Sequence, residues 1–194
     1  MIQPFRHFIQ RLHRLFDDTA LSSTQRQQQS AALLKNLIQH KDWLPEPHAQ
    51  PHPERYRQQL LYADLDERFS VLSFVWGPGQ ATPIHDHGVW GLVGVLHGAE
   101  VEERYKADAN GQLQRVARET LHENDVSTIC PRQGDIHQVR NAYDDRVSIS
   151  IHMYAGNIGR IQRHSYDATS GEARPFISRY ENALVPNLWF EPNA

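Results

Sequence analysis

The sequence has one cysteine, no long apolar run and no excess of basic residues, and each deficit excludes a class of protein. Cys130 alone cannot form an intramolecular disulfide or a cysteine-based zinc site. No apolar run approaches the roughly 18 residues that a membrane span needs. Twenty Lys and Arg against 23 Asp and Glu give a net charge of −3, whereas surfaces that bind nucleic acid or anionic membranes usually carry a positive excess. We therefore expect a cytoplasmic protein with no nucleic-acid or membrane partner.

The apolar content of the chain is ordinary, and its histidine content is not. The 194 residues are 39% hydrophobic and 22% charged, a balance that supports one folded domain and argues against a disordered chain. Neither a dinucleotide-binding glycine fingerprint nor a phosphate-binding loop occurs in the sequence. Twelve histidines are the unusual feature, so the search for a function begins with them.

The N-terminal part of the sequence, residues 1–44, has the spacing of helices. Apolar residues recur every three or four positions from Phe5 to Phe16, which is the stripe that a helix buries on one side. A second helix is expected to begin at Ser22–Thr24, whose side chains can cap it, and to end near His40. We predict that both helices pack outside the main domain.

A proline-rich connector, residues 45–55, follows the helical segment. Its prolines favour an extended chain, because proline cannot continue a helix and restricts the residue before it. His48 and His52 lie in this connector, and we predict that they belong to a solvated loop rather than to a site.

From residue 56 onward, the pattern changes to short strands. Phe69–Trp76 is rich in strand-forming residues and ends at a Gly-Pro-Gly turn. Similar runs follow at regular spacing, over residues 90–96, 101–106, 115–120, 126–129, 136–140 and 147–154. We therefore predict that residues 56–194 form a mainly β, small barrel with a C-terminal extension, and that the chain is one domain overall.

His85 and His87 are separated by one residue, in the segment Pro-Ile-His-Asp-His. On a strand, residues two apart face the same side and lie about 6–7 Å apart, so both imidazoles can reach one metal ion. Such a pair alone is a weak signal, since solvent-facing histidines are common on strands. Its surroundings strengthen it, namely Gly79, Gly91 and Gly98 around the pair and Pro131, Gly134, His137 and Asn141 in a later segment.

These two segments resemble the paired motifs of the cupin superfamily, whose small β-barrels hold a metal inside. The resemblance implies that His85, His87 and His137 are the metal ligands. Gly91 stands where the motif usually has a glutamate, and Asp125 stands where glycine is common in the second motif. Three neutral imidazoles would leave a divalent ion its full charge and favour an anionic ligand such as a thiolate. The alternative is that these histidines are only hydrogen-bonded.

Ser150, His152 and Tyr154 alternate with apolar residues and so share one face of a predicted strand. Their side chains can form a relay, from the serine hydroxyl through the imidazole to the phenol. They are not a hydrolase triad, because no nucleophile elbow surrounds Ser150 and no acid is evident to orient His152. The plainer alternative is a strand whose polar side faces water.

Together, Trp76-Gly77, the two histidine motifs and the Ser-Ile-His-Met-Tyr segment resemble the bacterial thiol dioxygenases, the family of cysteine dioxygenase and 3-mercaptopropionate dioxygenase. The resemblance spans about residues 55–165. It implies a mononuclear non-haem Fe(II) held by the three histidines, with Ser150, His152 and Tyr154 as a catalytic relay beside it. The implied reaction adds both atoms of O2 to the sulfur of a small thiol and gives a sulfinic acid.

The resemblance also bears on the identity of the thiol. In animal cysteine dioxygenases an arginine before the first motif holds the substrate carboxylate, and a gap-free count back from Phe69 and Trp76 puts Gln59 at that position. The bacterial 3-mercaptopropionate enzymes carry glutamine there and an arginine shortly after the relay tyrosine, which matches Arg163. This implies 3-mercaptopropionate as the substrate, bound by Gln59 and Arg163, with L-cysteine as the alternative.

Some alternatives stay open at this point. A metal-binding cupin that acts as a sensor or an isomerase would carry the same histidine motifs, and Arg160 and Arg163 would be ordinary surface charges if they bind no substrate. The histidines that fall in no ligand motif are predicted to be structural, namely His97, His122 and His164. Animal cysteine dioxygenases also carry a cysteine that crosslinks to the relay tyrosine, but the corresponding stretch Trp90-Gly91-Leu92 has no thiol.

Overall fold

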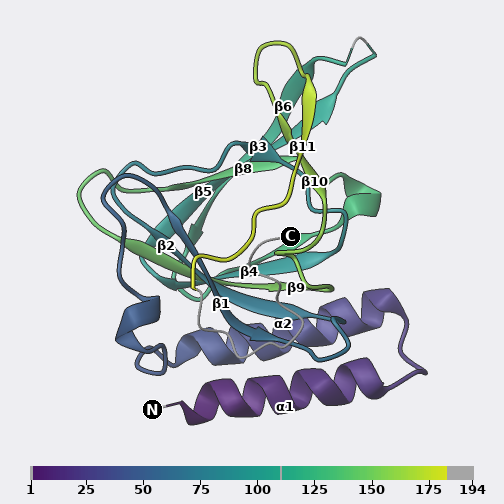
Figure 1. Ribbon diagram of the computed structural model, residues 1–194, viewed down its shortest axis with the longest axis vertical. Helices are drawn as coiled ribbons and strands as arrows, with labels where there is room; N and C mark the ends of the chain where they lie inside the picture. Colours follow the sequence, from purple (N-terminus) through teal and green to yellow (C-terminus); the bar gives the residue numbers. More distant parts are fainter. Residues whose placement is uncertain (1, 110, 183–194) are drawn as a thin grey trace.

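A computed structural model describes residues 2–109 and 111–182 of the chain (Figure 1). In this part of the chain two helices precede two antiparallel β-sheets, and the helices lie side by side along the outer face of one sheet. Residues 183–194, the end of the predicted C-terminal extension, lie outside the described residues. No helix of the described residues is long and apolar enough to cross a membrane.

The two N-terminal helices lie where the apolar spacing predicts them, α1 at Gln3–Asp17 and α2 at Ser23–Gln39. Ser22 begins α2 with a capping box: its hydroxyl accepts a hydrogen bond from the backbone N–H of Gln25, and the Gln25 side chain accepts one from the backbone N–H of Ser22. The connector that follows contains one short 3₁₀ turn, η1 (Glu46–His48).

Sheet A, which the helices cover, has the strand order β1-β2-β9-β4-β7. Its strands are β1 (Arg57–Ala63), β2 (Ser70–Trp76), β4 (Gly91–His97), β7 (Val126–Ile129) and β9 (Ser148–Tyr154). Sheet B has the order β11-β10-β3-β8-β5-β6. Its strands are β3 (Ile84–His85), β5 (Ala99–Ala107), β6 (Leu113–His122), β8 (His137–Asn141), β10 (Arg163–Tyr166) and β11 (Ala173–Phe176), and a 3₁₀ turn, η2 (Pro131–Gln133), precedes β8.

The prediction of a mainly β fold with helices packed outside is confirmed. The hydrogen bonds of the described residues leave two separate sheets, so the barrel is a sandwich-like jelly roll rather than one continuously bonded cylinder. Every residue of β2 and of β9 is buried, because the helices cover one face of sheet A and sheet B covers the other.

Sheet A separates two apolar cores. The outer core joins the helices to the sheet and includes Phe8, Leu12 and Leu34 together with Ile151 and Met153 of β9. The inner core lies between the sheets. Its buried members are Leu60, Leu72, Phe74, Trp76, Val93, Ile129, Val139, Tyr154 and Ile158. Because side chains alternate along a strand, the polar residues of β9 face this inner space while its apolar residues face the helices.

Candidate metal centre

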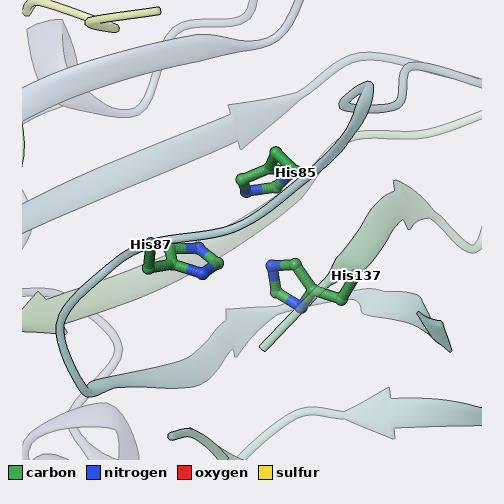
Figure 2. Close-up of side chains that lie close together, drawn as sticks. All are labelled: His85, His87 and His137. Carbon is green, nitrogen blue, oxygen red and sulfur yellow. The ribbon is translucent and has the colours of Figure 1, made fainter. Parts of the chain in front are cut away.

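Three histidines meet in the inner space, and their rings point toward one another (Figure 2). His85 ends β3 and is paired directly with His137, the first residue of β8, while His87 lies just beyond the end of β3. The potential ligand atoms of the three side chains all lie within 4.8 Å of one another. His85 and His87 are expected on one strand, but β3 ends at His85 and leaves His87 outside it. The side chains of both histidines nevertheless reach the same cluster.

Two of these rings are oriented by hydrogen bonds on their Nδ1 atoms. His85 Nδ1 donates to the carbonyl oxygen of Pro83 at 3.0 Å, and His137 Nδ1 donates to Glu102 Oε1 at 2.7 Å. A neutral imidazole that carries its hydrogen on Nδ1 has a free lone pair on Nε2. Both rings are therefore held in the tautomer that can bind a metal through Nε2.

Glu102, on β5, supports His137 and escaped the sequence analysis. It is buried, and its Oε2 accepts hydrogen bonds from Ser127 Oγ at 2.8 Å and from Arg104 Nη2 at 3.1 Å. Burial alone would raise the pKa of Glu102, but the hydrogen bond from His137 and the nearby Arg104 charge lower it to about 2. The carboxylate is therefore ionised at neutral pH. Its inward position in an alternating strand is the signal that could have singled it out.

His87 is the histidine of the cluster whose ring nitrogens make no hydrogen bond to the described residues. Both ring nitrogens are buried, and neither has a hydrogen-bond partner among residues 2–109 and 111–182. Asp135 Oδ2 lies 3.7 Å from Nδ1 and accepts a hydrogen bond from the backbone N–H of His87 instead. Burial, and then the neighbouring imidazoles, lower the pKa values of His85 and His87 well below the ordinary range. A buried, neutral imidazole without a partner fits a metal ligand, so this donor set suits a divalent ion such as iron.

The three polar residues of β9 form a hydrogen-bonded chain. Ser150 Oγ lies 2.9 Å from His152 Nε2, and His152 Nδ1 lies 2.9 Å from the phenolic oxygen of Tyr154. All three side chains are at most 3% exposed, so the alternative of a polar face in water is wrong. Phe74 stacks on the His152 ring at 4.0 Å. Burial lowers the pKa of His152 to about 3 and raises that of Tyr154, so both groups are neutral at pH 7.

Arg163, on β10, lines a small cavity of about 30 Å³ together with His85, His137 and Tyr154. It is 4% exposed, its Nη2 donates to Ser178 Oγ, and its guanidinium carbon lies 4.8 Å from the centre of the Phe176 ring. Among the described residues it forms no ion pair, and its Nε has no partner. Arg163 is therefore not a surface charge.

Arg160 differs from Arg163 in this respect. Its side chain is 50% exposed, and it forms an ion pair with Glu67 at 2.6 Å. Of these two arginines after Tyr154, Arg163 lines the cavity and Arg160 does not.

Gln59 is expected to bind the substrate, but its side chain does not line the cavity. Its Oε1 is hydrogen-bonded to His48 Nδ1 at 2.8 Å and its Nε2 donates to the carbonyl oxygen of Pro47, on the side of sheet A away from the cavity. Gln58 lines the cavity instead. The reason is a bulge in β1: the pairing with β2 shifts between Leu60 and Tyr62, and one extra residue reverses the faces of all residues before it. The same contact makes His48 a packed residue rather than part of a solvated loop.

The chain is similar to one protein family and to several solved structures. The family model of cysteine dioxygenase type I matches residues 5–167. Among solved structures, the protein TT1209 from Thermus thermophilus is 20% identical with a TM-score of 0.46, over 57% of this chain and 92% of that one. A double-stranded β-helix protein from Klebsiella pneumoniae is 14% identical with a TM-score of 0.47, over 69% and 88%. A cupin superfamily protein from Desulfitobacterium hafniense is 14% identical with a TM-score of 0.43, over 61% and 94%. The two antiparallel sheets themselves establish a mainly β fold for the described residues.

Proposed function

The chain belongs to the cysteine dioxygenase type I family, and on this premise we propose that it is an Fe(II)-dependent dioxygenase that prefers 3-mercaptopropionate. The reaction is R–SH + O2 → R–SO2H, in which both oxygen atoms join the sulfur and no external reductant is consumed. His85, His87 and His137 would hold the iron, which supplies the redox chemistry with O2 when bound. The protein's own groups bind the thiol, orient it and keep water out.

The observation that carries the substrate proposal is the buried guanidinium of Arg163 beside the histidine cluster, which forms no ion pair with residues 2–109 and 111–182. A buried charge is costly unless an opposite charge joins it. 3-Mercaptopropionate supplies that charge, because its carboxylate can meet Arg163 while its sulfur lies near the histidines.

L-Cysteine fits the cavity less well than 3-mercaptopropionate. Its additional ammonium group would need an acceptor, and preferably an acid. The described residues that line the cavity include no Asp or Glu. Gln58 offers only a neutral amide oxygen, and its Nε2 already donates to Ser178 Oγ and to the carbonyl oxygen of Arg179.

Tyr154 is the group that can hold a proton at the substrate. Burial keeps its phenol neutral, and its ring lies against His87 with the ring centres 5.5 Å apart. When His152 donates to the phenolic oxygen, the phenol hydrogen is free to donate a hydrogen bond to the substrate sulfur or to an oxygen atom added to it. In this proposal Ser150 and His152 fix the direction of that hydrogen.

Oxygen uptake by the iron-loaded protein with 3-mercaptopropionate, L-cysteine and cysteamine tests the proposal. We expect the highest kcat/KM for 3-mercaptopropionate. A charge-assisted hydrogen bond contributes ~1.5–3 kcal/mol, so Arg163→Ala should lower this kcat/KM roughly 10–100-fold, with a much smaller loss for cysteamine, which has no carboxylate. Arg160→Ala is the matched control and should leave the preference unchanged.

Three outcomes would count against parts of the proposal. A preference for L-cysteine would overturn the choice of substrate and leave the dioxygenase assignment in place. Equal losses for all thiols in Arg163→Ala would mean that Arg163 supports the fold rather than the carboxylate. Iron-loaded protein that consumes no oxygen with any thiol would favour a cupin that senses a ligand or isomerises a substrate.

A further inference from the structure

Glu100 is a buried carboxyl group that the proposed function does not use. It lies on β5 two residues before Glu102, so both side chains point into the space between the sheets. Glu100 is 0% exposed. In contrast to Glu102, neither of its oxygens has a hydrogen-bond partner among the described residues.

The groups around Glu100 do not compensate for an ionised carboxylate. On the paired strands it lies opposite Asn141 of β8, whose side-chain amide hydrogens go to backbone carbonyls, and opposite Leu121 of β6, which is apolar. Glu102 adds a like charge on the same strand. Within the described part of the chain no basic side chain acts on Glu100, so its neutral form is favoured.

Two polar side chains of sheet A face Glu100, Ser150 of β9 and Trp76 of β2. Burial raises the pKa of Glu100 to about 8, and these two side chains oppose that rise without making a hydrogen bond of standard geometry to either oxygen. Trp76 Nε1 donates its only hydrogen to Ser150 Oγ at 3.2 Å. At neutral pH Glu100 therefore carries a hydrogen of its own, and Ser150 Oγ has a second lone pair to accept it.

The hydrogens of the Ser150–His152–Tyr154 chain can be arranged in two ways, because neutral His152 carries one N–H. If Ser150 donates to His152 Nε2, then His152 Nδ1 donates to Tyr154 and the phenol hydrogen is free to point into the cavity. If Tyr154 donates to His152 Nδ1, then Nε2 donates to Ser150, whose own hydrogen must find another acceptor. In the first arrangement Ser150 Oγ can accept a hydrogen bond from a protonated Glu100. In the second, the Ser150 hydroxyl must donate its hydrogen to an ionised Glu100.

We propose that Glu100 is the fourth member of this chain and that its protonation state sets the direction of the hydrogen bonds, and so whether the Tyr154 phenol donates or accepts at the cavity. In passing from the first arrangement to the second, Glu100 gives a proton to Ser150, and Ser150, His152 and Tyr154 each receive one proton and pass one on. Glu100 is left ionised, and the phenolic oxygen of Tyr154 releases one proton through the cavity to hydroxide or a buffer base in the solvent. Glu100 is thus a positioning residue. Its effect on catalysis rests on the proposed function, whereas the direction of the hydrogen bonds does not.

The tautomer of His152 reports this direction without any turnover. We would measure the ring ¹⁵N shifts of His152 in the full-length, zinc-loaded protein, in which a diamagnetic ion fills the site, and assign them by comparison with His152→Gln. The expected result is hydrogen on Nδ1 at neutral pH and a change toward Nε2 as the pH rises through about 8. In Glu100→Gln, whose amide donates to Ser150 at every pH, hydrogen should stay on Nδ1 throughout the titration.

Glu103→Gln is the control on the same strand, since it neutralises a carboxylate of β5 that pairs with Arg115 rather than with the polar chain, and it should keep the pH-dependent change at His152. A wild-type His152 with hydrogen on Nε2 at neutral pH, or an unaltered titration in Glu100→Gln, would overturn the proposal. If Glu100→Gln fails to fold, infrared spectra of the wild-type protein still decide: the carbonyl stretch of a protonated buried carboxyl group should be present at neutral pH and lost above about 8, and its absence at neutral pH would refute the proposal. A protein that oxidises no thiol would refute the proposed function and leave both of these measurements valid.

Discussion

Gly91 lies directly opposite Tyr154 on the paired strands β4 and β9, and a Cβ atom on Gly91 would lie 2.7 Å from Cδ1 of the tyrosine ring. The absence of a side chain at position 91 therefore provides the space in which the phenol ring packs. A glutamate at this position would clash with Tyr154, because its side chain would begin where the phenol ring lies. The third histidine of the cluster is His137.

Gly91→Ala should displace the Tyr154 ring and lower kcat while the metal content stays near that of the wild type. Overpacking of this kind typically costs about 1–3 kcal/mol of unfolding free energy. Gly94→Ala is the control on the same strand, because its Cβ would meet Leu34 at 3.0 Å on the helix side of sheet A. Both variants should lower the denaturation midpoint, and only Gly91→Ala should lower kcat. A wild-type rate in Gly91→Ala would show that the position of the ring does not matter.

Replacement of any one of the three clustered histidines by alanine should lower the bound iron, measured by elemental analysis, and abolish turnover. Removing one of three ligands leaves an incomplete set. His122→Ala, at an exposed position of β6, should retain about one iron per chain. If His137→Ala kept its iron and activity, the assignment of the second motif would be wrong, and His152 would be the next ligand to test.

Tyr154→Phe should retain iron and lose much of the rate. The phenolic oxygen is hydrogen-bonded to His152 and is not one of the clustered ligand atoms, so its removal does not empty the site. Groups that support a metal site from outside typically account for ~10–100-fold in activity or affinity, and a loss of this size in kcat is expected. Unchanged kinetics at saturating iron would reduce the Ser150–His152–Tyr154 chain to a structural role.

Glu102 should make the stability of the metal-free protein pH-dependent in the acid range. Its pKa is lowered in the folded state from an ordinary 4.5 to about 2, so the folded state binds fewer protons than the unfolded state between these values. The stabilisation is fully present above the ordinary pKa and is lost as the pH falls toward the lowered one. The free energy of unfolding, measured with urea at each pH, should fall more steeply with decreasing pH over this range in the wild type than in Glu102→Gln. Parallel curves for the two proteins would contradict the ionic role of Glu102.

Local patterns were sufficient for most of the fold and for the histidine cluster. The apolar stripe of α1, the Ser22 cap of α2 and the alternation in β9 are each encoded within one segment, and the structure follows them closely. The short strand β3 is different, because it pairs with β10 and β8 by only a few residues and its extent depends on those partners.

The positions that sequence reasoning missed depend on contacts between distant segments. The displacement of Gln59 by Gln58 follows from one bulged residue in β1, which a gap-free count cannot detect. Glu102 gains its importance from His137 on a neighbouring strand, and Glu100 from Ser150 on the opposite sheet. An inward glutamate on an alternating strand is visible in the sequence, but its partner is not.

The burial of β2 and β9 on both faces ties the solubility of the protein to its first two helices. The outer core residues of these strands, such as Val71, Val75, Ile151 and Met153, are covered by α1 and α2. A chain that lacked residues 1–44 would present them as one contiguous apolar patch, which is the kind of surface that drives self-association. The inner faces of the same strands carry Trp76 and the Ser150–His152–Tyr154 chain, so the helices that cover the apolar face of the sheet pack against the back of the strands on which the polar chain is built.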